Sequence, residues 1–237
     1  MKALINTYAF RQTSIDSANL GVLGVVAHPI SNDGEFEGSV FQNAVQAKTF
    51  HLTVSEQMKN KQADVDLFTL VAQCQRQRTR YEEPSYSMAE NGYVVFFVSQ
   101  GPGGFHVLLK EQRKQKSRRV FDSRKLQKGD FFIVSLLRPG IYEMAEKYAK
   151  AEGKITIAYP KIEKQPYVPK PPETVIVSEA GFKPSNLKLG AAQGVIFTIE
   201  TSKAAVKVNL KEPSNGPGRK KGQTRDKVRW RNPSPIK

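Results

Sequence analysis

Short segments of alternating apolar and polar residues recur along the first half of this chain. Such a period of two is typical of strands that bury one face. It runs through segments 36–40, 50–54 and 65–70. Turn-forming residues at 31–34 and 59–61 separate these segments,. The pattern predicts a meander of strands that begins at Glu35, and therefore a mostly β fold.

Further strands are predicted after residue 90. The continuous apolar run 93–98 favours a strand buried on both faces, and the glycine-rich segment 101–104 that follows it favours a hairpin loop,. Segments 105–110 and 131–137 continue the β pattern. Only residues 144–152, with three alanines beside Glu, Lys and Met, indicate one or two turns of helix,.

A cluster of five prolines between Pro160 and Pro172 marks a boundary, because such a segment favours extended geometry and acts as a semi-rigid spacer,. Short apolar runs after it predict a small β-unit of too few strands to be stable alone. The predicted organisation is an N-terminal extension (1–34), a β-sandwich (35–160), a Pro-rich linker (161–173), a small β-unit (174–210) and a basic tail of the disordered type (211–237),.

The positive charge is confined to two stretches. The chain of 237 residues has a net charge of +15. Nine Lys or Arg against two acidic residues give +7 in segment 110–128, and the same counts give +7 in segment 211–237. The rest of the chain is close to neutral. The basic residues therefore predict two local surfaces that contact an acidic partner.

We expect these two surfaces to hold the partner-binding residues. In the basic loop they are Arg113, Lys114, Lys116, Arg118 and Arg119, and in the tail they are Arg219, Lys220, Lys221, Arg225, Lys227, Arg229, Trp230 and Arg231. The partner is either nucleic acid, whose phosphates the cations would neutralise while Trp230 stacks on a base, or an acidic protein surface on which Trp230 is the buried anchor.

Residues 92–157 resemble the second half of a cupredoxin, the blue-copper type of domain. The Gly92–Phe97 segment is similar to the family's Gly-x-x-Val-x-Phe strand, segment 105–107 to its His-bearing strand, and segment 139–144 to its closing Pro-Gly-x-Tyr strand. The resemblance covers about residues 80–160, with a weak partial second copy at 173–210. It implies a cupredoxin-like Greek-key β-sandwich.

The copper ligands of that family are almost all replaced. The Cys position falls at Met144, the next ligand position falls near Lys147, and only His106 keeps a ligand-like residue. A type 1 copper site requires a thiolate, and Cys74, the single cysteine, precedes His106, against the family order. The resemblance thus implies no functional copper site, and we expect no metal and no cofactor. A copper-dependent electron carrier using Cys74 is the second alternative.

The sequence offers no pattern for catalysis. It has no zinc-ligand spacing, no nucleophile elbow and no phosphate-binding Walker loop, and the paired Glu82 and Glu83 precede a proline as solvated loop residues do,. We predict a non-catalytic binding or assembly protein, a subunit of an oligomer or larger complex, with nucleic-acid binding as the alternative.

The apolar runs are too short for a membrane span, which needs about 18 residues. The run 20–27 has eight residues and follows a polar segment containing Asp16, an arrangement poor for a secretory signal,. The compartment is not defined by the sequence, and the cytoplasm is the favoured expectation.

Overall fold

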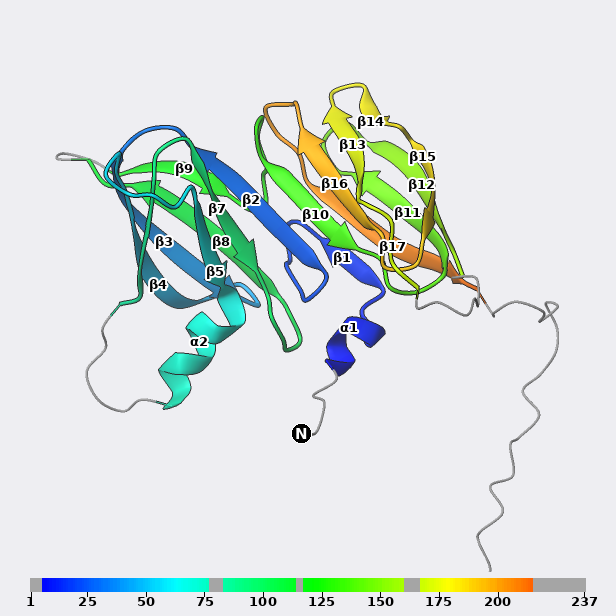
Figure 1. Cartoon of the computed structure of the whole chain (residues 1–237), viewed down its shortest axis with the longest axis horizontal. Coiled ribbons are helices and arrows are strands. Elements are labelled where there is room, and N and C mark those ends of the chain that lie inside the picture. The colour runs from blue at the N-terminus through cyan, green and yellow to red at the C-terminus, as the bar shows by residue number, and fades with distance from the viewer. Residues whose placement is uncertain (1–5, 77–82, 114–116, 160–166, 215–237) are drawn as a thin grey trace, which may run out of the picture.

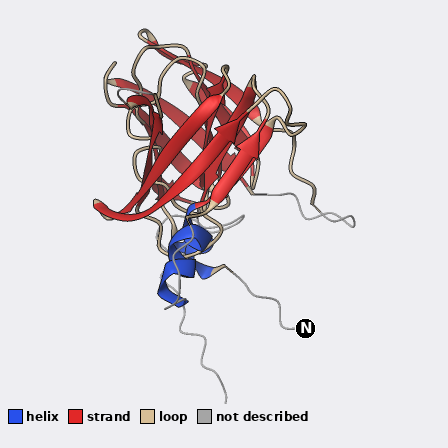
Figure 2. Ribbon diagram, turned by 90° about the vertical axis from the view of Figure 1, so that its left-hand side faces the viewer, coloured by secondary structure: helices blue, strands red, loops and turns tan. Residues whose placement is uncertain are grey.

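The structure is a computed structural model that describes residues 6–76, 83–113, 117–159 and 167–214. In this part of the chain the fold is mostly β, as the alternating pattern predicts. The two helices are α1 (Thr7–Arg11) and α2 (Leu67–Arg76). Both lie beyond one end of the strands and cover neither face of a sheet (Figures 1 and 2). Neither described helix is long and apolar enough to cross a membrane.

The strands follow one another through the whole described chain. They are β1 (Ser14–Asp16), β2 (Gly24–Ile30), β3 (Gly34–Gln42), β4 (Val45–Val54), β5 (Gln62–Asp66), β6 (Ser85–Met88), β7 (Gly92–Phe97), β8 (Phe105–Glu111), β9 (Arg118–Asp122), β10 (Phe131–Ser135), β11 (Gly140–Glu146), β12 (Ala151–Ala158), β13 (Glu173–Ser178), β14 (Gly181–Lys183), β15 (Asn186–Gly190), β16 (Gly194–Ile199) and β17 (Val206–Pro213).

These strands form three sheets. One five-stranded sheet has the order β6-β4-β3-β8-β9, a second has the order β1-β17-β11-β12-β15, and a seven-stranded sheet has the order β14-β13-β16-β10-β2-β7-β5. Figure 1 shows two halves side by side, and the seven-stranded sheet contributes to both. Strands β2, β7 and β5 back the first five-stranded sheet, and β10, β16, β13 and β14 back the second.

Strand β10 joins the two halves. It pairs antiparallel with β2 on one side and with β16 on the other, so Ile133 lies opposite Val25 and Ile196. The junction is therefore a ladder of backbone hydrogen bonds and not a flexible linker. Because β2 and β10 are the adjacent strands at this junction, the sheet continues from one half into the other without an edge.

The core lies between the sheets of each half. In the first half, Phe50 of β4 packs against Phe96 of β7 with ring centroids 6.2 Å apart, and both rings are fully buried. A Cβ on Gly38 would lie 2.0 Å from the Phe50 ring, so β3 needs glycine to pass over this ring. In the second half, Phe132 and Phe197 are paired on neighbouring strands of the seven-stranded sheet, stack at 5.9 Å and are fully buried on its inner face.

The prediction of a helix at residues 144–152 is wrong. Strand β11 runs to Glu146, a turn follows, and β12 begins at Ala151, so this segment is a hairpin. Met144 points into the core with no exposed surface. Burial of alternate residues along β11 outweighs the helix propensity of the alanines and charged residues in this segment.

The strand predicted for residues 65–70 ends earlier than expected. Strand β5 stops at Asp66, and α2 begins at Leu67. The Asp66 carboxylate accepts hydrogen bonds from the backbone N–H of Phe68 and from the Thr69 hydroxyl, which are groups of the first helical turn. Asp66 is thus a side-chain cap that ends the strand and starts the helix, and sequence alternation alone did not reveal it.

The apolar run 93–98 is not buried on both faces, contrary to the prediction. Val94, Phe96 and Val98 point into the core, but Tyr93 is 39% exposed and Val95 is half-buried on the outer face. The glycine-rich segment 101–104 also differs from the predicted hairpin loop, because it connects β7 to β8, which belong to different sheets.

The pairing of strands crosses the segment limits expected from the sequence. Strands β1 and β2 lie in the N-terminal segment 1–34, yet β1 pairs with β17 and β2 with β10. Strand β17 continues to Pro213, three residues into the segment expected to be a basic tail. The prolines between 160 and 166 lie outside the described residues.

Candidate anion-binding site

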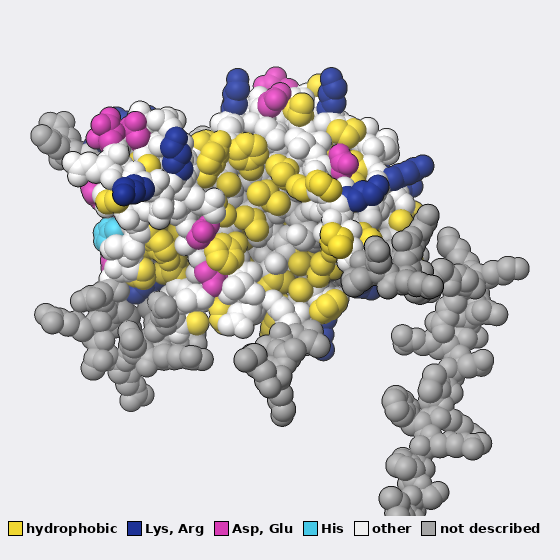
Figure 3. Space-filling model, in the orientation of Figure 1, with side chains coloured by type: hydrophobic (Ala, Val, Ile, Leu, Met, Phe, Trp, Pro, Cys, Tyr) yellow, Lys and Arg dark blue, Asp and Glu magenta, His cyan; other side chains and the backbone are white. Residues whose placement is uncertain are grey.

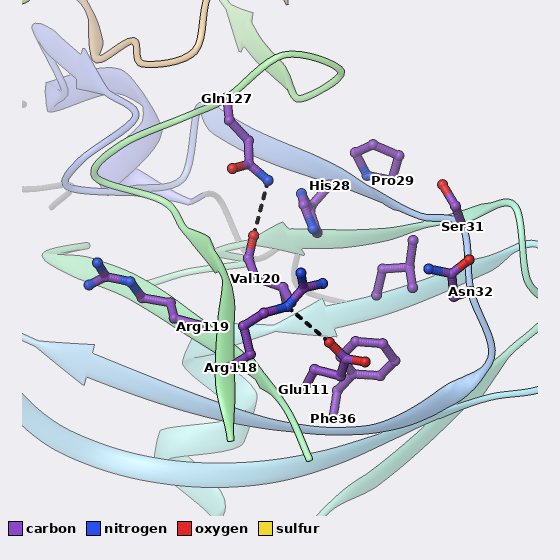
Figure 4. A pocket seen from close by; sticks show the side chains of 11 residues that line it. His28, Pro29, Ser31, Asn32, Phe36, Glu111, Arg118, Arg119, Val120 and Gln127 are labelled. Carbon is purple, nitrogen blue, oxygen red and sulfur yellow. Dashed lines mark hydrogen bonds and ion pairs between the residues drawn. The ribbon is translucent and has the colours of Figure 1, made fainter. Parts of the chain in front are cut away.

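A half-open pocket of about 310 Å³ lies at the mouth of the first half, where the interior between its two sheets opens to solvent. It lies between the end of β2, the start of β3, the end of β8 and the start of β9 (Figure 4). Its lining residues are His28, Pro29, Ile30, Ser31, Asn32, Phe36, Glu111, Arg118, Arg119, Val120 and Gln127.

The imidazole of His28 is held in one orientation at this pocket. His28 occupies an inward position of β2 and is 5% exposed. Its Nδ1 lies 2.7 Å from Oδ1 of Asp130, whose side chain is completely buried. The ring also packs on Phe121, with centroids 4.7 Å apart. No hydrogen bond from the described residues reaches Nε2, so this nitrogen can serve a ligand in the pocket.

The Asp130 carboxylate also shapes the loop beside the pocket. Its Oδ2 accepts the backbone N–H of Gln127 at 2.8 Å, and the Gln127 side chain donates to the carbonyl oxygen of Val120 at 3.0 Å. One buried carboxylate thereby connects β2, the loop before β10 and the edge strand β9. The pocket is preorganised because its wall is fixed by these hydrogen bonds.

A β-bulge brings two consecutive arginines to the pocket. Residues 118 and 119 pair with Glu111 and Lys110, and the register then shifts before Phe121. Side chains of neighbouring strand residues normally point to opposite faces, and a bulge redirects one of them. Figure 4 shows Arg118 between Glu111 and His28, with Arg119 pointing to the side.

Both guanidinium groups keep donors for a ligand. Arg118 is 61% exposed and engages Glu111 through Nε alone, at 3.1 Å. Arg119 is 57% exposed, and its one ion pair within the described residues is a long one of 3.8 Å to Asp122. A guanidinium carries five N–H donors in a planar fork that suits carboxylates and phosphates.

Arginines outside the pocket, Arg113 and Arg124, also engage the two neighbouring carboxylates. The hydrogen bond from Arg113 is the main cause that lowers the pKa of Glu111. Burial alone would raise the pKa of Asp122, but hydrogen bonds from Arg124 outweigh it and lower this pKa. Both acids therefore stay ionised at neutral pH. Their negative charge is balanced by Arg113 and Arg124 as well as by the two pocket arginines.

The structure gathers part of the predicted basic loop at this pocket. Arg118 and Arg119 line it, and Arg113 lies just outside, 2.9 Å from Glu111. Lys114 and Lys116 lie outside the described residues, as do the predicted tail residues Arg219, Lys220, Lys221, Arg225, Lys227, Arg229, Trp230 and Arg231. Sequence reasoning missed His28 and Gln127. The available signal was a histidine at an inward position of an apolar strand.

The positions compared with copper ligands are not brought together. His106 lies on β8 and Met144 on β11, and these strands belong to different sheets. The His106 ring stacks on Phe41 at 4.6 Å, and burial of the ring is the main cause that lowers its pKa. Among the described residues, no three His, Cys, Asp or Glu side chains are grouped to hold a metal ion. The side chain of Cys74 is outside the described part.

Comparison of the chain with protein-family models, with curated proteins and with solved structures found no match.

Proposed function

We propose that this protein is a non-catalytic binding subunit that recognises an acidic segment of another protein at the pocket formed by β2, β8 and β9. The observation that carries the proposal is the pair Arg118 and Arg119 beside a fixed His28. Arg118 lies between Glu111 and His28 at this pocket, and Arg119 stands at its side, so the site offers guanidinium N–H donors next to a ring nitrogen. Charge-assisted hydrogen bonds from guanidinium to carboxylate are about twice as strong as neutral ones.

The strand next to the pocket favours an extended acidic peptide over nucleic acid. Strand β9 is the last strand of its sheet, so one of its edges has no neighbouring strand among the described residues. An extended segment can add to such an edge through backbone hydrogen bonds, while alternate side chains reach the pocket. Acidic side chains of that segment would then meet Arg118 and Arg119.

Nucleic-acid binding is the alternative. It is supported by the +7 charge of segment 110–128 and by the equal charge of segment 211–237 with its single tryptophan. A phosphate backbone would use the same two arginines, and its binding would weaken steeply with salt. A copper-dependent carrier that uses Cys74 is the second alternative; it has less support, because His106 belongs to no group of three His, Cys, Asp or Glu side chains among the described residues.

The test is a titration of the full chain with a fluorescent, extended, Glu-rich peptide and, separately, with a single-stranded oligonucleotide. The double variant Arg118→Ala and Arg119→Ala should weaken peptide binding by about tenfold or more, given roughly 1 kcal/mol per lost hydrogen bond. The matched control is Lys188→Ala with Lys207→Ala, which removes the same charge from exposed positions of the distant β15 and β17.

If both double variants weakened peptide binding equally, the effect would come from net charge alone, and the proposal of a binding site at this pocket would be wrong. Preferential binding of the oligonucleotide, lost with the pocket arginines, would replace the acidic peptide with nucleic acid as the partner.

A further inference from the structure

The outer face of the seven-stranded sheet is apolar across both halves of the molecule. Figure 3 shows hydrophobic side chains gathered along the middle of this face, over the strands that Figure 1 places there. These side chains are half-buried and point away from the core. The central members are Val25, Val95, Phe97, Phe131, Ile133 and Ile196.

The outer faces of the other two sheets are more polar. The sheet of β1 and β11 directs Glu143, Lys154 and Lys207 outward, and the sheet of β3 and β4 directs Glu37 and His51 outward. Apolar side chains such as Phe41, Val45 and Ile141 also lie on those two faces, but they are interspersed with polar ones, so the widest apolar stretch among the described residues is on the seven-stranded sheet. A contiguous apolar patch of this kind is typical of an interaction surface.

One row of paired residues runs across all seven strands of this face. Its order is Asp64, Val95, Ala27, Phe131, Thr198, Ile176 and Lys183, one from each strand. An exposed carboxylate stands at one end and an exposed ammonium at the other. Phe131 is the middle residue of the row, and its strand β10 is the middle strand of the sheet.

We propose that this face binds a second copy of the chain, face to face, around a two-fold axis that runs along β10. Such an axis reverses the order of the strands, so β5 of one copy lies over β14 of its partner. The rotation places the row of one copy over the same row of the partner, in reverse order. Asp64 then meets the partner subunit's Lys183 at both ends of the interface, and the two Phe131 rings meet at its centre.

The charges at the ends of the row favour a second copy of the chain as the partner, in this orientation. A two-fold axis perpendicular to the strands would instead place β5 over β5 and bring Asp64 of one copy against the same residue of the other, which repels. A two-fold interface uses the same patch on both subunits and must complement itself. The row fulfils this requirement because its opposite ends carry opposite charges.

The size of the face is sufficient for a weak, reversible dimer. Seven strands spaced by roughly 4.8 Å span about 29 Å, and five residues of β10 span about 17 Å. The flat projection is then about 500 Å² for each copy, or roughly 1,000 Å² in total, which meets the minimum for a biological interface and is the size of a weak, reversible one. Sheets packed in this way cross at about 30°, an offset that a lysine side chain can bridge.

The first test is sedimentation velocity on the full chain over a series of concentrations, with the double variant Val95→Thr and Ile133→Thr. Threonine keeps the β-branched shape, so the strands stay formed while the face becomes polar. The wild type should show a reversible dimer, and the double variant should raise the dimer Kd by more than tenfold. The control is Ile141→Thr, on the outer face of another sheet, which should leave the dimer unchanged.

The second test swaps the charges at the ends of the row. Asp64→Lys and Lys183→Asp should each raise the dimer Kd several-fold, and the double variant should restore it, because the exchanged charges face each other again. A wild type that stays monomeric at the highest soluble concentration would overturn the proposal. A double variant that is not restored would overturn the orientation along β10. Replacing Arg118 and Arg119 should leave the dimer intact.

Discussion

The carboxylate of Asp130 lies 2.7 Å from Nδ1 of His28 and has no exposed surface. The backbone of the same residue accepts the N–H of Ile199, in β16, at 3.0 Å. Asp130 therefore connects a strand of the first half to a strand of the second half, just before β10 begins. The same contact that orients His28 in the pocket also stabilises the junction between the halves.

Replacing Asp130 should weaken the fold as well as the pocket. Asp130→Ala removes the acceptor for two groups, the buried His28 ring and the partly buried Gln127 N–H. We expect a loss of about 3 kcal/mol in the free energy of unfolding, measured by urea denaturation. Asp130→Asn keeps one acceptor oxygen and should lose clearly less. An Asp130→Ala protein with an unchanged midpoint would contradict this role.

Asp66 should make the stability depend on pH in the acid range. Burial alone would raise the pKa of Asp66, but hydrogen bonds from Ser99 and Thr69 and from backbone N–H groups lower it. A lowered pKa in the folded state means that the carboxylate stabilises the fold above the pKa of the unfolded chain. This stabilisation is lost as the pH falls through the folded-state pKa.

The measurement is urea denaturation of the wild type and Asp66→Ala between pH 7 and pH 3. At pH 7 the variant should be less stable by about 1 kcal/mol, a typical value for a lost helix cap that is partly exposed. The difference should shrink as the pH falls below about 4. A constant difference at all pH values would show that the charge of Asp66 contributes nothing.

Truncation should separate the tail from strand β17. A chain that ends at Ser214 keeps every pair between β11 and β17 and should melt at the wild-type temperature. A chain that ends at Leu210 loses the pairing of Glu212 and Pro213 with β11, and the bond from Ser214 N–H to the Pro139 carbonyl oxygen. We expect it to lose about 2 kcal/mol. Differential scanning calorimetry of the two proteins measures this, and equal melting temperatures would contradict it.

The sequence was informative where burial alternates along one strand. Segments 50–54, 105–110 and 131–137 were predicted as strands, and the structure has β4, β8 and β10 there. It was less informative where a side chain acts on the backbone, as the cap at Asp66 shows. It also failed for 93–98, because a continuous apolar run has the same pattern whether its second face meets a protein core or solvent.

Only the positive charge of the pocket can be predicted from the sequence. Arg118 and Arg119 were identified from the basic cluster, but their contact with His28 depends on β2 and β9 meeting at the mouth of the first half. About 90 residues separate them in the sequence. Nothing in the local pattern around residue 28 specifies its distant partner Asp130. Pairing between such distant positions is a property of the topology and not of any one segment.

The pairing of β1 with β17 has a consequence for synthesis on the ribosome. Ser14 lies opposite Asn209, so two strands almost 200 residues apart in the sequence pair at the edge of one sheet. Strand β1 must wait, unpaired, until β17 has been translated and has left the exit tunnel. The first half, whose eight strands end at Asp122, contains no such distant partner within its own five-stranded sheet. The first half can fold while the second half is still being translated, so the two halves fold one after the other.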